Sequence, residues 1–293
     1  MSAENNVGAS MEAIQYHYDV SNDFYRFFLD TEMSYSCALW YTGQESLDVA
    51  QQQKIDYHID NLELNPAAAS RVLDIGCGWG AVMRRVKQRY ALSTVTGITL
   101  SDAQVQHIDT LNLTDITATL ENWQDHQAAK GTYDGIISVG AFEHFATPEA
   151  SQEEKIQGYR NFFTSCYQWL KPSGIISLQT IGAGNMKRED LHHFFATEIF
   201  PESDLPRLAD IATASTFLFE IVSVRNDREM YANTLREWLK NLQGNKQTVV
   251  NTFGTDLFKK YEKYFSLLIL AFDVYKSMDL YRIKLRKIDK PRQ

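Results

Sequence analysis

The chain has 293 residues, a hydrophobic content of 44% and a formal net charge of −8 at pH 7. Its length and composition suffice for one large α/β domain or two small ones with a proper core. The acidic balance excludes a general nucleic-acid binder, whose binding surface would be basic. The three cysteines are far apart and lack C-x-x-C spacing, which argues against a disulfide framework or a zinc site and favours a reducing cytosol.

Targeting and membrane-spanning signals in the sequence predict where the protein resides. Residues 1–10 are polar and carry no secretory signal, and the longest apolar run, residues 264–272, is too short to span a bilayer. We therefore expect a cytoplasmic protein that is at most peripheral to a membrane. Seven basic residues lie within 276–292. They predict a solvated surface or, less often, a docking patch for an acidic carrier protein or lipid headgroups.

The first sixty-five residues form a predicted N-terminal helical cap. Residues 14–29 place Tyr16, Val20, Phe24 and two further aromatic residues at helical spacing, which indicates an amphipathic helix or helix pair. This aromatic density fits either a core or a cap over a ligand pocket. Residues 33–40 show no clear periodicity and are loop-like, and residues 46–64 return to a helical pattern.

The segment 72–80 is the point around which the chain is organised. Its first half reads as a buried strand, and Gly76, Gly78 and Gly80 permit a sharp turn and a close approach to a ligand. No lysine followed by Ser or Thr comes after the loop, which argues against a nucleoside triphosphate site. Asp74 before the first glycine favours S-adenosylmethionine over NAD. Taken alone, the motif equally fits an ordinary tight turn.

Alternating elements follow this turn. The pattern predicts a helix over 81–90, a strand over 94–100 with Ser101 as the N-cap of the next helix, strands over 117–120 and 133–139, a helix over 154–170, and a strand over 175–180. This order is typical of a class I methyltransferase with a mostly parallel sheet. The inserted segment 182–208 breaks the alternation. Phe217–Val224 and Met230–Tyr231 are expected to be the last, antiparallel strands, and Trp238 to start a helical tail.

The carboxyl ends of parallel strands face the ligand crevice, so polar residues there are candidates for function. Thr99, Leu100 and Gln104 are placed for the ribose, and Trp123 either covers the adenine or is a structural tryptophan. Glu143 and His144 follow the fourth strand and are placed for chemistry, although a structural role for either is as plausible. The paired His192 and His193 indicate a metal only weakly, and we predict no metal site.

Several segments together resemble the cyclopropane fatty acid and mycolic acid synthases, S-adenosylmethionine-dependent methyltransferases that act on lipid double bonds. The resemblance runs from about residue 16 to about residue 238 and is carried by the glycine turn and by His17-Tyr18-Asp19-Val20-Ser21, Tyr35-Ser36-Cys37-Ala38, Gly97-Ile98-Thr99-Leu100-Ser101, Gly140-Ala141-Phe142-Glu143-His144-Phe145 and Thr197-Glu198-Ile199-Phe200-Pro201.

The resemblance implies which residues form the site. Cofactor-binding positions are Tyr35, Ser36, Gly76, Gly78, Thr99, Leu100, Gln104 and Trp123, to which the strand ends add Asp74 and Gly140. A bicarbonate ion near the reacting methyl group would be held by Cys37, Glu143, a histidine and Tyr231. In this chain Gln179 stands at the histidine position.

Gln179 is the most informative departure from the family pattern. Its amide can still donate a hydrogen bond, but it cannot carry the charge of an imidazolium. Bicarbonate would then bind more weakly, or Glu143 would act as the base itself. The carbocation left by methyl transfer to an alkene can also be converted to a methyl branch or an exocyclic methylene. A further alternative is that the nucleophile is not an alkene.

These observations predict a single α/β domain over residues 1–293. It comprises a class I methyltransferase seven-stranded sheet, with a helical cap (1–65), a cofactor-binding core (66–180), an inserted substrate-covering segment (181–215) and a C-terminal part (216–293). The predicted reaction is transfer of a methyl or methylene group to a carbon of an unsaturated, lipid-like substrate through a carbocation. The alternative is a C- or N-methyltransferase of a small specialised metabolite. A protein that binds the cofactor without catalysis is disfavoured because Glu143 and Tyr231 are both present.

Overall fold

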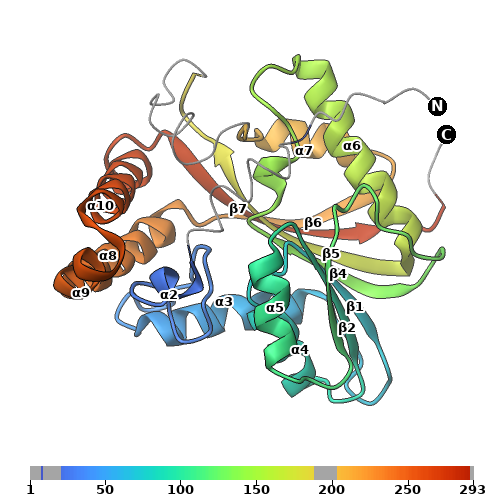
Figure 1. Ribbon diagram of the computed structural model, residues 1–293. Helices are drawn as coiled ribbons and strands as arrows, with labels where there is room; N and C mark the ends of the chain where they lie inside the picture. The colour runs from blue at the N-terminus through green and yellow to red at the C-terminus, as the bar shows by residue number, and fades with distance from the viewer. Residues whose placement is uncertain (1–7, 9–20, 188–202, 291–293) are drawn as a thin grey trace.

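The structure, a computed structural model, describes residues 8, 21–187 and 203–290. A seven-stranded sheet in the order β3-β2-β1-β4-β5-β7-β6 forms its centre (Figure 1). The strands are β1 (Arg71–Ile75), β2 (Thr94–Thr99), β3 (Ile116–Leu120), β4 (Tyr133–Val139), β5 (Leu170–Ala183), β6 (Phe219–Asn226) and β7 (Met278–Lys287). All pairings are parallel except those of β7, which runs antiparallel to both β5 and β6. The predicted fold class is confirmed.

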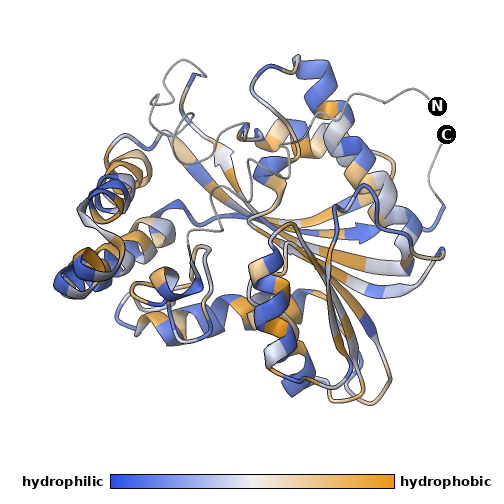
Figure 2. Ribbon diagram, viewed as in Figure 1, coloured by the Kyte–Doolittle hydropathy of each residue, from blue (hydrophilic) through white to orange (hydrophobic). Residues whose placement is uncertain are grey.

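Helices cover both faces of the sheet. On one face lie α3 (Leu47–Asn61), α4 (Ala81–Arg89) and α5 (Asp102–Thr110), and on the other lie α6 (Gln152–Trp169) and α7 (Leu208–Ser215). Successive residues of a strand point to opposite faces, so Val72 packs with the first group of helices and Leu73 with the second. The central strands β1 and β4 accordingly consist mainly of buried residues, whereas the outer strands β3 and β6 contain more polar and exposed ones. Figure 2 shows the hydropathy of each strand.

A third hydrophobic cluster lies beside the sheet, where a separate group of helices gathers at the left of Figure 1. These helices are α2 (Asn22–Tyr25), α8 (Arg228–Gly244), α9 (Lys246–Phe253) and α10 (Thr255–Ile269), followed by the π-helical turn η4 (Leu270–Val274). The cluster also contains the loop at 33–40. Thr234 of α8 fixes this loop, because its Oγ1 accepts hydrogen bonds from Ala38 N at 3.1 Å and Trp40 Nε1 at 3.0 Å.

The C-terminal part differs from the prediction in two ways. Met230–Tyr231 is not a strand but lies in the first turns of α8. The basic segment 276–292 is not a solvated surface, because most of it forms β7, the strand inserted between β5 and β6. On β7, the side chains of Leu280, Ile283 and Leu285 are buried, and Arg282 is fully buried as well.

Several predicted features fall partly or wholly outside the described residues. Residues 14–20 of the predicted first helix and residues 188–202 of the inserted segment lie there, including His192 and His193. Within the described part, β5 extends to Ala183 and the chain continues as α7 from Leu208. Ser101 does precede α5 as its N-cap residue, but its side chain makes no capping hydrogen bond.

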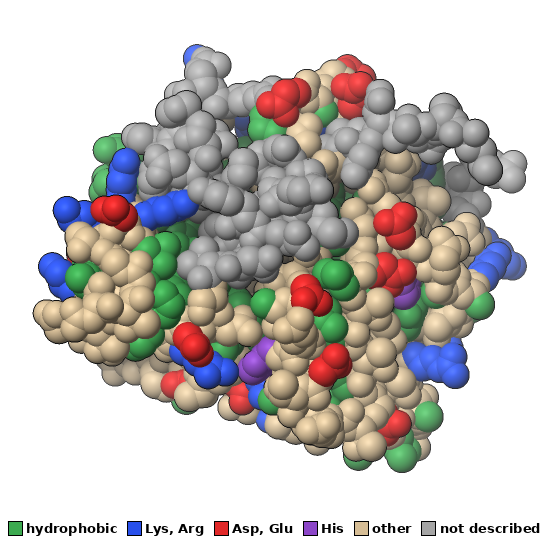
Figure 3. Space-filling model, in the orientation of Figure 1, with side chains coloured by type: hydrophobic (Ala, Val, Ile, Leu, Met, Phe, Trp, Pro, Cys, Tyr) green, Lys and Arg blue, Asp and Glu red, His purple; other side chains and the backbone are tan. Residues whose placement is uncertain are grey.

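Two further findings concern the surface and the helices. Among the described side chains visible in Figure 3, Lys and Arg are interspersed with Asp and Glu and form no continuous basic surface. In the part of the chain that the structure describes, no helix is both long and apolar enough to cross a bilayer.

Candidate active site

The turn between β1 and α4 contains three glycines with positive φ, at +80° for Gly76, +54° for Gly78 and +85° for Gly80. A Cβ on Gly76 would lie 2.7 Å from the Cβ of Ala141, which follows β4. A Cβ on Gly78 would meet no atom within 4 Å. Gly76 therefore allows the turn to pack against the end of β4, while Gly78 leaves open space above the turn.

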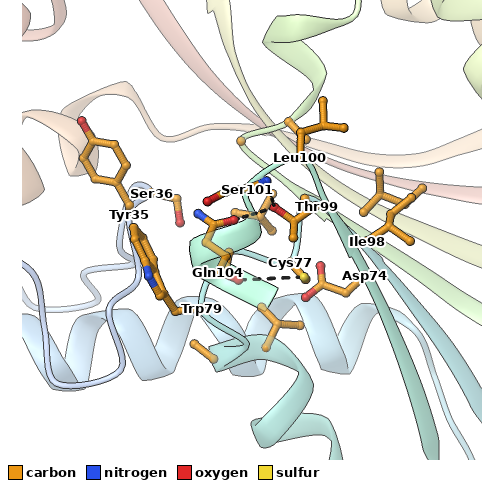
Figure 4. A pocket seen from close by; sticks show the side chains of 18 of the residues that line it. Tyr35, Ser36, Asp74, Cys77, Trp79, Ile98, Thr99, Leu100, Ser101 and Gln104 are labelled. Atoms are coloured by element: carbon orange, nitrogen blue, oxygen red, sulfur yellow. Dashed lines mark hydrogen bonds between the residues drawn. The ribbon is translucent and has the colours of Figure 1, made fainter. Parts of the chain in front are cut away.

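This turn lines a hollow of about 980 Å³, which we call the glycine-loop cavity. Figure 4 shows side chains from the loop before α3, from the turn and from the end of β2 around it. Every residue predicted to bind the cofactor lines it: Tyr35, Ser36, Asp74, Gly76, Gly78, Thr99, Leu100, Gln104, Trp123 and Gly140. The carboxyl ends of four strands, β1 to β4, and one loop thus meet at a single site.

At the end of β2, Thr99 Oγ1 donates a hydrogen bond to Gln104 Oε1 at 2.5 Å (Figure 4). The sequence offered no carboxylate at this strand end. The neighbouring strand supplies one, because Glu121 directly follows β3, lines the same cavity, and donates its N–H to Thr99 O at 2.9 Å. The pairing of β2 with β3 brings Glu121 beside Thr99 at the cavity, and this pairing could not be assigned from residue order alone.

Trp123 lies between the cavity and the hydrophobic core. Its side chain lines the glycine-loop cavity and is almost fully buried. Its ring packs against Phe145 and Phe162, with centroid distances of 5.2 Å and 5.5 Å. The aromatic core therefore fixes the orientation of a flat apolar wall at the cavity.

Two buried groups that can carry opposite charges, Asp74 and Lys54, also line this cavity. Burial raises the pKa of Asp74 to about 7, and its Oδ2 has no hydrogen-bond partner among the described residues. Lys54 of α3 is 2% exposed and donates to Ser36 Oγ at 2.9 Å, and burial lowers its pKa to about 8. An ammonium and a carboxylate on a ligand would each find an opposite charge here.

Sequence reasoning missed Lys54, although a signal was present. Ala50, Lys54 and His58 are spaced by four residues and occupy the buried face of α3. A lysine on the buried face of a helix has to find a polar partner, and this lysine finds it at the cavity.

A second hollow, of about 830 Å³, adjoins the first and is called here the Glu143 cavity. The two share the lining residues Tyr35, Ser36, Gly140 and His144. All residues predicted to be catalytic line the Glu143 cavity: Cys37, Glu143, Gln179 and Tyr231. Much of the remaining wall is apolar and comes from Ile181, Leu205, Leu268, Met278 and Leu280. The arrangement suits a hydrophobic ligand with a few polar contacts.

Glu143 lies in the short 3-10 helix η1 (Phe142–His144) after β4. Its Oε1 accepts a hydrogen bond from the backbone N–H of Ile181 at 2.6 Å, and its buried Oε2 has no partner among the described residues. Burial raises the pKa of Glu143 to about 7. The carboxyl group can therefore exchange a proton near neutral pH.

Two other titratable side chains of this cavity, His144 and Cys37, are neutral at pH 7. Burial lowers the pKa of His144 to about 4, and its Nδ1 lies 2.7 Å from Ser203 Oγ. Burial also raises the pKa of Cys37 to about 11, so it is a thiol, with Sγ donating to Ala38 O at 3.2 Å. Tyr231 is held by ring contacts with Phe272 at 4.7 Å and with Trp238 at 6.1 Å.

Gln179 of β5 contacts a residue that sequence reasoning assigned to the surface. Its Oε1 accepts a hydrogen bond from Arg282 Nε at 2.8 Å and lies 3.2 Å from His58 Nε2. Its Nε2 donates to Cys37 O at 3.4 Å. Neither Arg282 nor His58 could be linked to the site from the sequence, because each comes from a different part of the chain.

Comparisons with known proteins agree with this geometry. The family model for mycolic acid cyclopropane synthetase matches residues 6–283. Cyclopropane mycolic acid synthase 1 of Mycobacterium tuberculosis is 33% identical over 271 residues, which cover 86% of this chain and 88% of that protein. Cyclopropane mycolic acid synthase 3 of the same species is 34% identical over 269 residues, covering 86% and 88% of the two chains.

Solved structures give the same result. The cyclopropane synthase MmaA2 from Mycobacterium tuberculosis has a TM-score of 0.84 and 31% identity, covering 97% of this chain and all of that one. Mycolic acid cyclopropane synthase CmaA1 complexed with SAH and CTAB has a TM-score of 0.85 and 30% identity over the same shares. Coclaurine N-methyltransferase, at 19% identity, shares the fold with a TM-score of 0.80, covering 97% of this chain and 84% of that one. The chain therefore belongs to the mycolic acid cyclopropane synthetase family and is an S-adenosylmethionine-dependent methyltransferase of the cyclopropane fatty acid synthase type.

Proposed function

We propose that this enzyme transfers a methyl or methylene group from S-adenosylmethionine to a carbon of an unsaturated, lipid-like substrate held in the Glu143 cavity. The observation that supports this most strongly is the buried, unpartnered Oε2 of Glu143 in a largely apolar cavity that adjoins the glycine-loop cavity. A base is needed where the substrate meets the cofactor, and Glu143 is the carboxylate at that junction.

The glycine-loop cavity fits the cofactor. In this proposal Asp74 accepts a hydrogen bond from the ammonium group of the cofactor through its free Oδ2, and Lys54 pairs with the carboxylate. Glu121 and Gln104 bind the ribose hydroxyl groups, and Trp123 covers the adenine. The open space above Gly78 leaves room for the cofactor to approach the backbone.

When bound, S-adenosylmethionine supplies an electrophilic methyl group. An alkene that attacks this methyl becomes a carbocation, which ends by losing a proton to a base. Glu143, with a pKa of about 7, is that base, acting directly or through a bicarbonate ion. The ring of Tyr231 can stabilise the cation, and the Gln179 amide offers an N–H to an anion, while Cys37 lines the same cavity.

The second candidate is a C- or N-methyltransferase of a compact specialised metabolite. It is favoured by Gln179, which cannot carry the positive charge that a histidine at this position would offer to bicarbonate. In that case Glu143 would accept a proton from the nucleophile itself rather than from a carbocation.

The test uses a cofactor whose transferred methyl group is fully deuterated. The enzyme is incubated with monounsaturated acyl chains, presented either in phospholipid vesicles or on an acidic acyl carrier protein, and the product is analysed by mass spectrometry. Ring closure loses one deuterium from the methyl carbon, whereas proton loss elsewhere keeps all of them. If demethylated cofactor forms with small metabolites but with neither form of the acyl chain, the second candidate replaces the lipid proposal.

A further inference from the structure

Gln179 and Arg282 are directly opposite each other in the antiparallel pairing of β5 and β7. Arg282 is fully buried, and its Nε lies 2.8 Å from the side-chain oxygen of Gln179. A guanidinium group can only donate hydrogen bonds, so the atom of Gln179 that faces it has to be the oxygen. The amide nitrogen of Gln179 must then point the other way, toward Cys37 O and the Glu143 cavity.

His58 reinforces this orientation. Burial and the neighbouring charge of Arg282 hold the pKa of His58 well below its ordinary value, so the imidazole is neutral. Its Nδ1 lies 2.8 Å from Ser177 Oγ and its Nε2 lies 3.2 Å from Gln179 Oε1. Since Oε1 can only accept, His58 carries its proton on Nε2 and accepts from Ser177 through Nδ1. Two donors therefore hold the same oxygen.

The charges around Arg282 do not cancel. Its guanidinium pairs with Asp227 and also donates to Cys37 O at 3.2 Å and Ala38 O at 3.0 Å. Asp227 is shared, because Arg225 donates to both of its carboxylate oxygens at 3.1 Å and 3.0 Å. Two guanidinium groups thus face one carboxylate, which leaves an excess of positive charge close behind Gln179. Arg282 is fully buried, so water screens its charge little, whereas the side chain of Arg225 is 38% exposed.

We propose that Arg282 is a positioning residue of the reaction site. It locks the Gln179 amide with an N–H directed into the Glu143 cavity, and it provides from behind Gln179 the positive charge that favours a small oxyanion such as bicarbonate. The charge that a histidine at position 179 would carry is supplied by the adjacent strand instead. This inference rests on the proposed use of the Glu143 cavity as the reaction site.

Arg282 also ties the loop at 37–38 to the sheet, so a purely structural role has to be separated from an electrostatic one. The structural role predicts that changes at Arg282 alter stability and all binding together. The positioning role predicts a selective loss of anion binding, with cofactor binding retained.

The test measures binding to the SAH complex of the full-length protein, without turnover. Carbon-13-labelled bicarbonate is titrated with wild type, Arg282→Gln and Arg282→Lys and followed by the NMR line width of the ion, while calorimetry gives the SAH affinity. We expect Arg282→Gln to weaken bicarbonate binding about tenfold or more, because the Gln179 amide loses its fixed orientation and the positive charge behind it is removed. The SAH affinity should stay within about twofold, and Arg282→Lys, which keeps the charge, should lie between the two.

Two further variants keep the test decisive. Lys287→Met removes another buried cation of β7, whose Nζ donates to Leu170 O away from both cavities, and it should leave bicarbonate binding unchanged. Gln179→Glu keeps the contact with Arg282 but removes the N–H, and it should abolish bicarbonate binding even if Arg282→Gln does not fold.

The inference is overturned if Arg282→Gln or Gln179→Glu binds bicarbonate as tightly as wild type, or if the wild-type complex binds none. A failure to convert any unsaturated lipid would refute the proposed substrate class alone, because none of these binding measurements depends on turnover.

Discussion

Ile181 holds Glu143 by a single hydrogen bond of 2.6 Å, from its backbone N–H on β5 to the Oε1 of the carboxyl group that follows β4. The other oxygen, buried and without a partner among the described residues, is free to take a proton. Glu143→Gln keeps an oxygen for Ile181 but cannot act as a base. We expect this variant to lose turnover and to retain its SAH affinity, measured by product formation and calorimetry. A fully active variant would rule out Glu143 as the base.

The same substitution should change how stability depends on pH. The pKa of Glu143 is raised from 4.5 to about 7 in the folded state. The contribution of this carboxyl group to folding stability is therefore complete below pH 4.5 and is lost as the pH rises through 7. The free energy of unfolding of Glu143→Gln should therefore rise relative to that of wild type between about pH 4.5 and pH 8, by on the order of 3 kcal/mol. Urea denaturation at both ends of this range measures the difference. An equal difference between the two proteins at both ends would contradict the raised pKa.

Asp74 should make cofactor binding depend on pH. Its pKa of about 7 means that the carboxylate becomes protonated as the pH falls below neutrality, and the ammonium group of the cofactor then loses its partner. Asp74→Asn should bind S-adenosylmethionine about tenfold more weakly at pH 8 and show little further loss at lower pH. Calorimetry over this pH range provides the measurement. If the affinities of wild type and variant change with pH in parallel, the pH dependence of cofactor binding belongs to another group. Lys54, with a pKa of about 8, would then be the next candidate.

Two glycines of the same turn should respond differently to alanine. In Gly76→Ala the new methyl group would collide with Ala141 in addition to the strain of a positive φ, so we expect a loss of about 2–4 kcal/mol in unfolding free energy. Gly78→Ala meets no protein atom and should lose only about 1 kcal/mol from its positive φ, while its methyl group obstructs the cofactor. Urea denaturation and calorimetry of both variants separate the two effects. If both variants lose the same unfolding free energy, the positive φ alone accounts for the loss and the contact with Ala141 adds nothing.

The first half of the chain could be predicted well from sequence because its signals are local. The buried strand, the glycine turn and the alternating units up to β5 all follow from patterns within about ten residues. Polar residues at the strand ends then converge because parallel strands end at one edge of the sheet. This is why every predicted cofactor-binding residue lines one cavity and every predicted catalytic residue lines its neighbour.

Arg282 could not be predicted because its environment is made by distant residues. A basic residue among other basic residues indicates a solvated surface. Its burial depends on acceptors far away in the sequence, of which Asp227, 55 positions earlier, is the charged one. Met230–Tyr231 was misassigned for a related reason. These residues look like a strand by composition, but Asp227 starts a helix that packs Leu235 and Trp238 into the third hydrophobic cluster.

The insertion of β7 between β5 and β6 has a consequence for the order in which the molecule can assemble. Within the described residues β6 pairs with β7 alone, yet α8, α9 and α10 lie between them in the chain. During translation β6 leaves the ribosome without its partner, and the edge of β5 stays open to any other extended segment until β7 arrives. Because β7 also carries Arg282, the reaction site proposed above is completed only in the step that closes this aggregation-prone edge.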